Sequence, residues 1–151
     1  MKDIKKDYDE AAKYYKKALE INPNHSNHLG NYALFLEYIR KDYDEAEKYY
    51  KKVLKIDPDD ADFLEYYAVF LWKIKNKYDE TEKYYKRALA IDQNNAIRLG
   101  NYAEFLWEIK KDYDEAEKYY RKSFEIDPND ADTIKNYETF LNERSKIISQ
   151  K

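Results

Sequence analysis

The sequence predicts an all-α fold in which antiparallel helix pairs stack on one another, with about eight helices. Three observations lead to this prediction. The sequence aligns with itself when shifted by 35 residues, its apolar residues recur at helical spacing, and only 2 Gly and 3 Pro occur in 151 residues. The string DYDEAEKYY, for example, stands unchanged at 42–50 and 112–120. Because one helix hairpin cannot bury its apolar face alone, the pairs are expected to stack.

The first helix of each period carries apolar residues at steps of three and four. Leu29, Tyr32 and Leu36 lie on one face, and Ala33 between them lets a neighbouring helix approach closely. The same face recurs in the next two periods as Leu64, Tyr67, Ala68, Leu71 and Ile74, and as Leu99, Tyr102, Ala103, Leu106 and Ile109.

The second helix has its own start and stop signals. At its start, Asp42 is expected to accept a hydrogen bond from the backbone amide of Glu45, and the Glu45 side chain to bond back to the amide of Asp42. At its end, Pro58 cannot continue the helix, and Asp60 offers a cap for the next one. The same signals occur at Asp7/Glu10, Asp112/Glu115, Pro23, Pro128 and Asp130.

The chain is expected to form a single array, 1–151. The segment 2–11 parallels 108–116, so residues 7–25 form a half repeat that holds a second helix only. Full repeats follow at 26–60, 61–95 and 96–130, and 131–151 forms a C-terminal capping helix. The open N-terminal edge has two explanations: the chain is a fragment of a longer array, or the edge packs on another subunit.

The pattern resembles the tetratricopeptide repeat (TPR), with one residue more than that family's usual 34. The matching residues in one full copy are Leu29, Tyr32, Ala33, Leu36, Ala46, Tyr50, Val53 and Pro58. The extra residue is expected between the two helices, near Arg40 and Lys41, and departures from the pattern occur at Thr81, Gln93 and Glu138. The resemblance implies a right-handed α-α superhelix, a solenoid whose first helices line a concave groove for a ligand.

The resemblance places a ligand-binding stripe on the first helices. The stripe comprises Leu34, Glu37, Tyr38, Glu65, Val69, Trp72, Lys73, Glu104, Trp107, Glu108, Thr139 and Asn142. Trp72 and Trp107 have two interpretations, packing against the following helix or contact with the ligand. Gly30 and Gly100 either permit a close approach of neighbouring groups or are unselected variation. The stripe is aromatic and mostly acidic, so we expect a protein or peptide partner with basic and apolar residues.

Family members that hold the carboxylate of a chaperone tail use Lys, Arg and Asn. Asn31, Asn101 and Asn136 stand in suitable rows, but Glu65 and Glu104 occupy places where positive charge is needed. The sequence therefore disfavours chaperone-tail binding.

Composition argues against several other functions. The net charge of −3 predicts no nucleic-acid or membrane partner, and the absence of Cys excludes thiolate chemistry. His25 and His28 are expected to be loop and capping residues, and the aspartates at 57–62 to be caps, so no metal and no cofactor is predicted. The N-terminus has no apolar stretch typical of a signal peptide, which favours a soluble, cytoplasmic protein.

These observations favour a non-enzymatic protein–protein interaction scaffold or adaptor that binds a peptide or protein segment in its groove. One alternative is a self-assembling structural module that stacks through its N-terminal edge into a homo-oligomer. Another is an RNA-processing scaffold of the half-a-TPR type, suggested by the aromatic run Tyr67, Phe70 and Trp72. The sequence leaves open the partner, the pathway, the organism, the oligomeric state, and whether the repeats are natural or a designed consensus.

Overall fold

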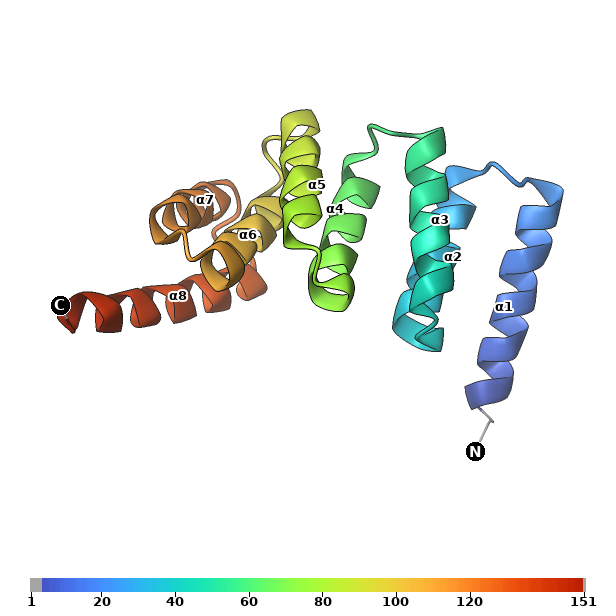
Figure 1. The fold of residues 1–151 in the computed structure, drawn as a ribbon, viewed down its shortest axis with the longest axis horizontal. Coiled ribbons are helices and arrows are strands. Elements are labelled where there is room, and N and C mark those ends of the chain that lie inside the picture. Colours follow the sequence, from blue (N-terminus) through green and yellow to red (C-terminus); the bar gives the residue numbers. More distant parts are fainter. Residues whose placement is uncertain (1–3, 151) are drawn as a thin grey trace. The chain divides into compact units, whose positions relative to one another are not determined.

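The computed structural model describes residues 4–150, and all regular elements in this range are helical (Figure 1). The predicted all-α fold with about eight helices is thereby confirmed for the described residues. The helices are α1 (Ile4–Ile21), α2 (Ser26–Phe35), α3 (Tyr43–Ile56), α4 (Ala61–Phe70), α5 (Tyr78–Ile91), α6 (Ala96–Phe105), α7 (Tyr113–Ile126) and α8 (Ala131–Ser149). We call α2, α4, α6 and α8 the first-type helices and α1, α3, α5 and α7 the second-type helices.

The described residues form two compact units that divide inside α5, between Tyr84 and Tyr85. In the first unit α2 packs beside α3, and in the second α6 packs beside α7. The repeat boundaries drawn from the sequence remain a prediction. Within residues 4–150, none of the helices combines the length and apolar character needed to cross a lipid bilayer.

Tyrosines that recur with the period join the helices of the first unit. Tyr32 meets Tyr49 edge-on at 4.8 Å between ring centroids, and Tyr67 meets Tyr84 in the same way at 4.9 Å. Tyr50 is fully buried and stacks on Tyr67 at 5.8 Å. Each such pair stabilises by about 0.5–1.5 kcal/mol beyond the area that it buries. The repeated tyrosines are therefore the main packing residues of this core.

The second unit repeats this packing and ends on α8. Tyr102 meets Tyr119 edge-on at 4.9 Å, and Tyr120 stacks on Tyr137 of α8 at 5.2 Å. Arg144 of α8 forms ion pairs with Asp114, at 2.6 Å, and with Glu117 of α7. Aromatic stacking and charge thus both hold α8 against α7.

Three first-type helices end in a π-helical turn, where the sequence predicts one residue beyond the family's length. These turns are η1 (Leu36–Arg40), η2 (Leu71–Lys75) and η3 (Leu106–Lys110). After η1 the chain enters the left-handed region at Lys41 (φ 57°), whose amide donates to the carbonyl of Leu36. A π turn accommodates an additional residue without breaking the helix. The extra residue is therefore absorbed in the last turn of the helix and the residue that follows it.

The capping prediction is half confirmed. The backbone amides of Glu45 and Glu115 donate to the side chains of Asp42 and Asp112, at 3.3 and 3.2 Å. The return bond from each glutamate is wrong, because the amide of Asp42 donates to the Leu36 carbonyl at 2.9 Å, and that of Asp112 donates to the Leu106 carbonyl. The π turn supplies this acceptor.

The predicted cap at Asp7 is also wrong. Helix α1 begins at Ile4, and Asp7 lies inside its first turn. The preceding residues include Lys5 and Lys6, which favour helix and extend it upstream. The caps at Asp60 and Asp130 are confirmed, since they accept from the amides of Phe63 and Thr133 at 3.1 and 2.9 Å.

Candidate protein-binding surface

The π turn η1 places a carboxylate below the surface of the first unit. The Glu37 side chain accepts a hydrogen bond from the Tyr50 hydroxyl at 2.5 Å, and Glu37 is only 5% exposed. Burial raises the pKa of Glu37, while hydrogen bonds from Tyr50 and Tyr38 and the charge of Lys41 partly oppose this rise. Glu37 is therefore a buried acidic group that accepts a hydrogen bond from the Tyr50 hydroxyl.

Two tyrosine rings near this carboxylate remain open to solvent. Tyr38 of η1 is 54% exposed and Tyr66 of α4 is 41% exposed. Burial raises the pKa of Tyr38, and the neighbouring Glu37 and Tyr66 raise it further. The two tyrosines, on different elements, are therefore close enough to interact.

We group with these tyrosines apolar and basic residues of the same unit, namely Leu34 of α2, Val69 of α4 and Lys73 of η2. Leu34 and Val69 are half-buried, and Lys73 is exposed with its amine 3.4 Å from the centroid of the Trp72 ring. We call the group Leu34, Glu37, Tyr38, Tyr66, Val69 and Lys73 the tyrosine face. It combines aromatic rings, apolar side chains and a buried acid with an exposed lysine.

The corresponding residues of the second unit are more polar. The Asn136 amide of α8 donates to the Glu104 carboxylate of α6 at 3.3 Å. Trp107 is 6% exposed and lies edge-on against Phe140 at 5.7 Å between ring centroids. Glu108, Thr139 and Asn142 are exposed. An asparagine from the suspected clamp row is thus bonded to a glutamate of its own unit.

The structure separates the predicted stripe into accessible and buried residues. Glu37, Glu65, Trp72 and Trp107 are buried and present little surface to a ligand. Of the two interpretations of Trp107, its contact with Phe140 supports packing against the following first-type helix. The other members of the stripe are half-buried or exposed: Leu34, Tyr38, Val69, Lys73, Glu104, Glu108, Thr139 and Asn142.

Sequence reasoning did not select Tyr66 for the stripe. It stands one period after Asn31 and one before Asn101, so its register placed it in the row considered for a carboxylate clamp. The sequence signal that could have identified Tyr66 is its aromatic side chain, because the same position holds asparagine in the periods before and after it.

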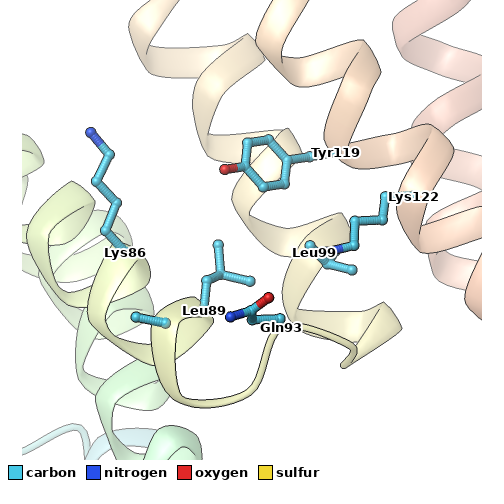
Figure 2. A pocket seen from close by; sticks show the side chains of 7 residues that line it. Lys86, Leu89, Gln93, Leu99, Tyr119 and Lys122 are labelled. Carbon is cyan, nitrogen blue, oxygen red and sulfur yellow. The ribbon is translucent and has the colours of Figure 1, made fainter.

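The second unit also contains a surface pocket of about 300 Å³, and none of the tyrosine-face residues lines it. Its apolar part consists of Leu89 and Ala90 of α5 and Leu99 of α6 (Figure 2). Its polar part consists of Lys86 of α5, Gln93 of the following turn, and Tyr119 and Lys122 of α7. Gln93 is one of the departures from the repeat pattern, but the sequence alone did not indicate a pocket.

The two histidines have a structural role. His25 accepts a hydrogen bond from the backbone amide of His28 at 3.4 Å, and their rings stack at 3.9 Å between centroids. The predicted capping role is confirmed for His25, whereas His28 lies within α2 and contributes only its backbone amide. In residues 4–150, no three His, Cys, Asp or Glu side chains are grouped so as to hold a metal ion.

Comparisons with known proteins agree with the repeat pattern. Family models described as tetratricopeptide repeat match residues 3–25, 32–96 and 74–132. A comparison with curated proteins found no match.

Several solved structures have a similar fold but a sequence only 19–20% identical to this chain. A structure from the functional characterization of Pseudomonas aeruginosa pilF is 20% identical, with a TM-score of 0.80 over 95% of this chain. This chain spans 64% of that one. YrrB, described as a TPR protein with an unusual peptide-binding site, is 20% identical, with a TM-score of 0.70 over 93% of this chain and 71% of its own. The first TPR of Spaghetti (RPAP3), bound to the HSP90 peptide SRMEEVD, is 19% identical, with a TM-score of 0.70 over 80% of this chain and 93% of its own.

At these identities the likeness shows the fold, and it confirms the predicted solenoid of helix pairs. The family matches, the period of tyrosines and alanines, and the helix pairs agree with one another. The chain belongs to the tetratricopeptide repeat family.

Proposed function

We propose that this chain is a non-enzymatic interaction module whose tyrosine face binds a peptide or protein segment with basic and apolar residues. The observation that supports this proposal most is the buried carboxylate of Glu37 beside the exposed rings of Tyr38 and Tyr66. A cation above an exposed aromatic ring is stabilised by about 0.5–1 kcal/mol, and a nearby carboxylate adds attraction. Leu34 and Val69 offer the apolar contact.

The charges along the tyrosine face favour one direction of binding. Glu37 and Tyr38 lie on η1, whereas the Lys73 amine lies over Trp72 on η2. A basic side chain is therefore expected at the η1 end and an apolar or acidic one at the η2 end. The HSP90 peptide in the RPAP3 structure is SRMEEVD, which ends in acidic residues; the ligand proposed here is basic.

A fluorescence anisotropy titration tests this proposal. The probe is a labelled peptide with the sequence Ala-Leu-Lys-Leu-Lys-Ala, and the reference is the same peptide with Glu in place of Lys. We expect the basic peptide to bind the full chain more tightly, and the double variant Tyr38→Ala, Tyr66→Ala to weaken its binding about tenfold or more.

The matched control is Tyr14→Ala on α1, which removes an exposed tyrosine outside the tyrosine face. It is expected to leave binding unchanged while circular dichroism shows that all variants stay helical. Equal binding of the two peptides, or equal losses in the double variant and the control, would contradict the proposal.

A second candidate function, self-assembly through the N-terminal edge, has one observation in its favour. Tyr14 is 72% exposed, whereas Tyr49, Tyr84 and Tyr119 at the same position of the period each lie edge-on against a tyrosine of a first-type helix. If a second copy covers this ring, light scattering will show a mass above 18.4 kDa that falls in the Tyr14→Ser variant. A mass that stays at the monomer value at every concentration would remove this candidate.

A further inference from the structure

The pocket of the second unit differs from the tyrosine face in its charge. None of its seven lining residues is acidic, and two of them, Lys86 and Lys122, are cationic. The Tyr119 hydroxyl and the Gln93 side-chain amide add two hydrogen-bonding groups that can donate. Since Leu89, Ala90 and Leu99 supply the apolar part, the pocket combines donors with an apolar floor.

Lys122 gives this pocket a positive charge that is not neutralised. Its neighbours on α7 are paired, Lys118 with Glu115 at 2.9 Å and Arg121 with Glu117 at 2.6 Å. Lys122 itself makes no ion pair with any residue in the range 4–150. Its side chain runs toward Leu99, and the Tyr119 hydroxyl points from α7 toward α5 (Figure 2). A bound carboxylate would supply the missing counter-charge.

Gln93 makes the pocket particular to one repeat. The corresponding residues of the other periods are Pro23, Pro58 and Pro128, which have neither an amide side chain nor a backbone N–H. Gln93 lies beside Leu89 in the turn after α5 (Figure 2). One substitution in the repeat pattern therefore adds a donor next to the apolar floor.

We propose that this pocket binds a peptide segment in which a carboxylate stands beside an apolar side chain. The apolar side chain packs on Leu89, Ala90 and Leu99, and the carboxylate receives hydrogen bonds from Lys122 and from the Tyr119 or Gln93 donors. A volume of about 300 Å³ is at the lower end for ligand sites, which suits one or two side chains. The pocket lies largely on second-type helices, so this inference does not depend on the function proposed for the tyrosine face.

A ¹⁵N–¹H chemical-shift titration of the full chain tests this inference. The probe is the capped peptide N-acetyl-Ala-Leu-Asp-Ala-amide, and its isosteric reference has Asn in place of Asp. We expect saturable shifts of the amides of Leu89, Gln93 and Tyr119, and about tenfold weaker binding of the Asn peptide, because a charge-assisted hydrogen bond is lost.

Two variants and a matched control complete the experiment. Lys122→Gln is expected to weaken binding of the Asp peptide about tenfold, and Gln93→Pro to weaken it severalfold. The control Lys52→Gln removes the same charge at the corresponding position of α3, in the first unit, and is expected to have no effect.

Three results would overturn the inference. They are the absence of saturable shifts at the pocket, equal binding of the Asp and Asn peptides, and equal weakening by Lys52→Gln and Lys122→Gln. The last would mean that the peptide responds only to the net charge of the chain.

Discussion

At one tyrosine position of the repeat, a neighbouring residue determines whether the buried hydroxyl has a hydrogen-bond partner and therefore how much the tyrosine stabilises the fold. Tyr50 and Tyr120 are equivalent and both are fully buried. The Tyr50 hydroxyl donates to Glu37, whereas the Tyr120 hydroxyl is buried with no hydrogen-bond partner among residues 4–150. The sequence explains the difference, because Trp107 takes the place of Glu37 in the third full period. A buried polar group without a partner is destabilising.

We therefore predict different results for the same substitution at these two positions. Tyr50→Phe leaves the buried Glu37 carboxylate without its hydroxyl donor and is expected to lower the free energy of unfolding by about 1–3 kcal/mol. Tyr120→Phe removes an unpartnered hydroxyl and is expected to be neutral or stabilising. Urea denaturation followed by circular dichroism measures both, and a larger loss at Tyr120 would contradict this explanation.

Gly30 is a second residue whose role the structure decides. A Cβ atom at Gly30 would stand 1.9 Å from the Phe63 ring of α4, so the glycine makes room for that ring. At Gly100 the nearest group would be the Thr133 hydroxyl at 2.7 Å. Of the two interpretations that the sequence left open, close approach is the one that the structure supports.

Gly30→Ala is expected to destabilise the chain by about 1–3 kcal/mol through overpacking, although alanine favours helix by about 1 kcal/mol. Shortening the opposing side chain in Gly30→Ala, Phe63→Leu is expected to recover part of the loss. Thermal denaturation of the two single variants and the double variant measures this coupling. Strictly additive losses would show that the methyl group and the ring do not meet.

At the scale of elements, each of the three π turns is followed by one residue with left-handed backbone. Lys41, Asn76 and Lys111 have φ of 57°, 54° and 57°. A lysine in this region is strained, whereas glycine is not and asparagine is comparatively tolerant. The turn geometry is thus retained in all three cases, with the favourable asparagine in one of them.

We predict that Lys111→Gly raises the free energy of unfolding by up to about 1 kcal/mol, because relief of strain exceeds the entropy cost of glycine. The reverse test is Asn76→Lys, which is expected to lower stability. Differential scanning calorimetry gives both shifts in melting temperature. If Lys111→Gly destabilises and Asn76→Lys does not, the left-handed assignment of these residues is wrong.

Helix α3 and the turn η2 are joined by charges around Glu47. Burial tends to raise the pKa of Glu47, but hydrogen bonds and charges from Lys51 and Lys75 outweigh it and lower the pKa to about 2. Lys75 lies 3.1 Å from Glu47 and 2.8 Å from Asp44. The Tyr67 hydroxyl also donates to Glu47, at 3.2 Å.

The lowered pKa of Glu47 predicts a pH dependence of stability with a definite sign. A carboxyl whose folded pKa lies below its unfolded value stabilises the fold above the unfolded value, 4.5, and this contribution is lost as the pH falls toward 2. Urea denaturation between pH 2 and 7 is expected to show a smaller acid-induced loss in Glu47→Gln than in the unchanged chain. Parallel curves for the two proteins would contradict this role of Glu47.

The sequence predicted the positions of the helices well, but it predicted less well how the helices end and which polar side chains are buried. Helical spacing located the helices around Tyr32 and Tyr50, since apolar residues at steps of three and four lie on one face. Helical spacing did not reveal the π turns. The pattern of apolar residues scarcely differs between an α-helix, whose backbone amides bond to the carbonyl four residues earlier, and a short π-helix, whose amides bond to the carbonyl five residues earlier. Glu37 looked like a surface residue because its partner, the Tyr50 hydroxyl, comes from another helix.

At the scale of the whole molecule, one repeat pattern carries two different surface chemistries. The first unit presents the tyrosine face with a buried acid, and the second has a pocket lined by hydrogen-bond donors. The pocket was beyond sequence reasoning because its lining comes from three helices and the turn after α5. The shared positions maintain the helix pairs, and the variable positions are the ones that we propose to bind partners.

The tyrosine face is proposed to bind a basic and apolar peptide. The most direct measurement is a ¹⁵N–¹H chemical-shift map of the full chain with the Ala-Leu-Lys-Leu-Lys-Ala peptide. We predict shifts at Leu34, Tyr38, Tyr66, Val69 and Lys73, with the amide of Tyr14 unchanged. Shifts confined to the second-type helices, with Tyr38 and Tyr66 unmoved at saturation, would contradict it.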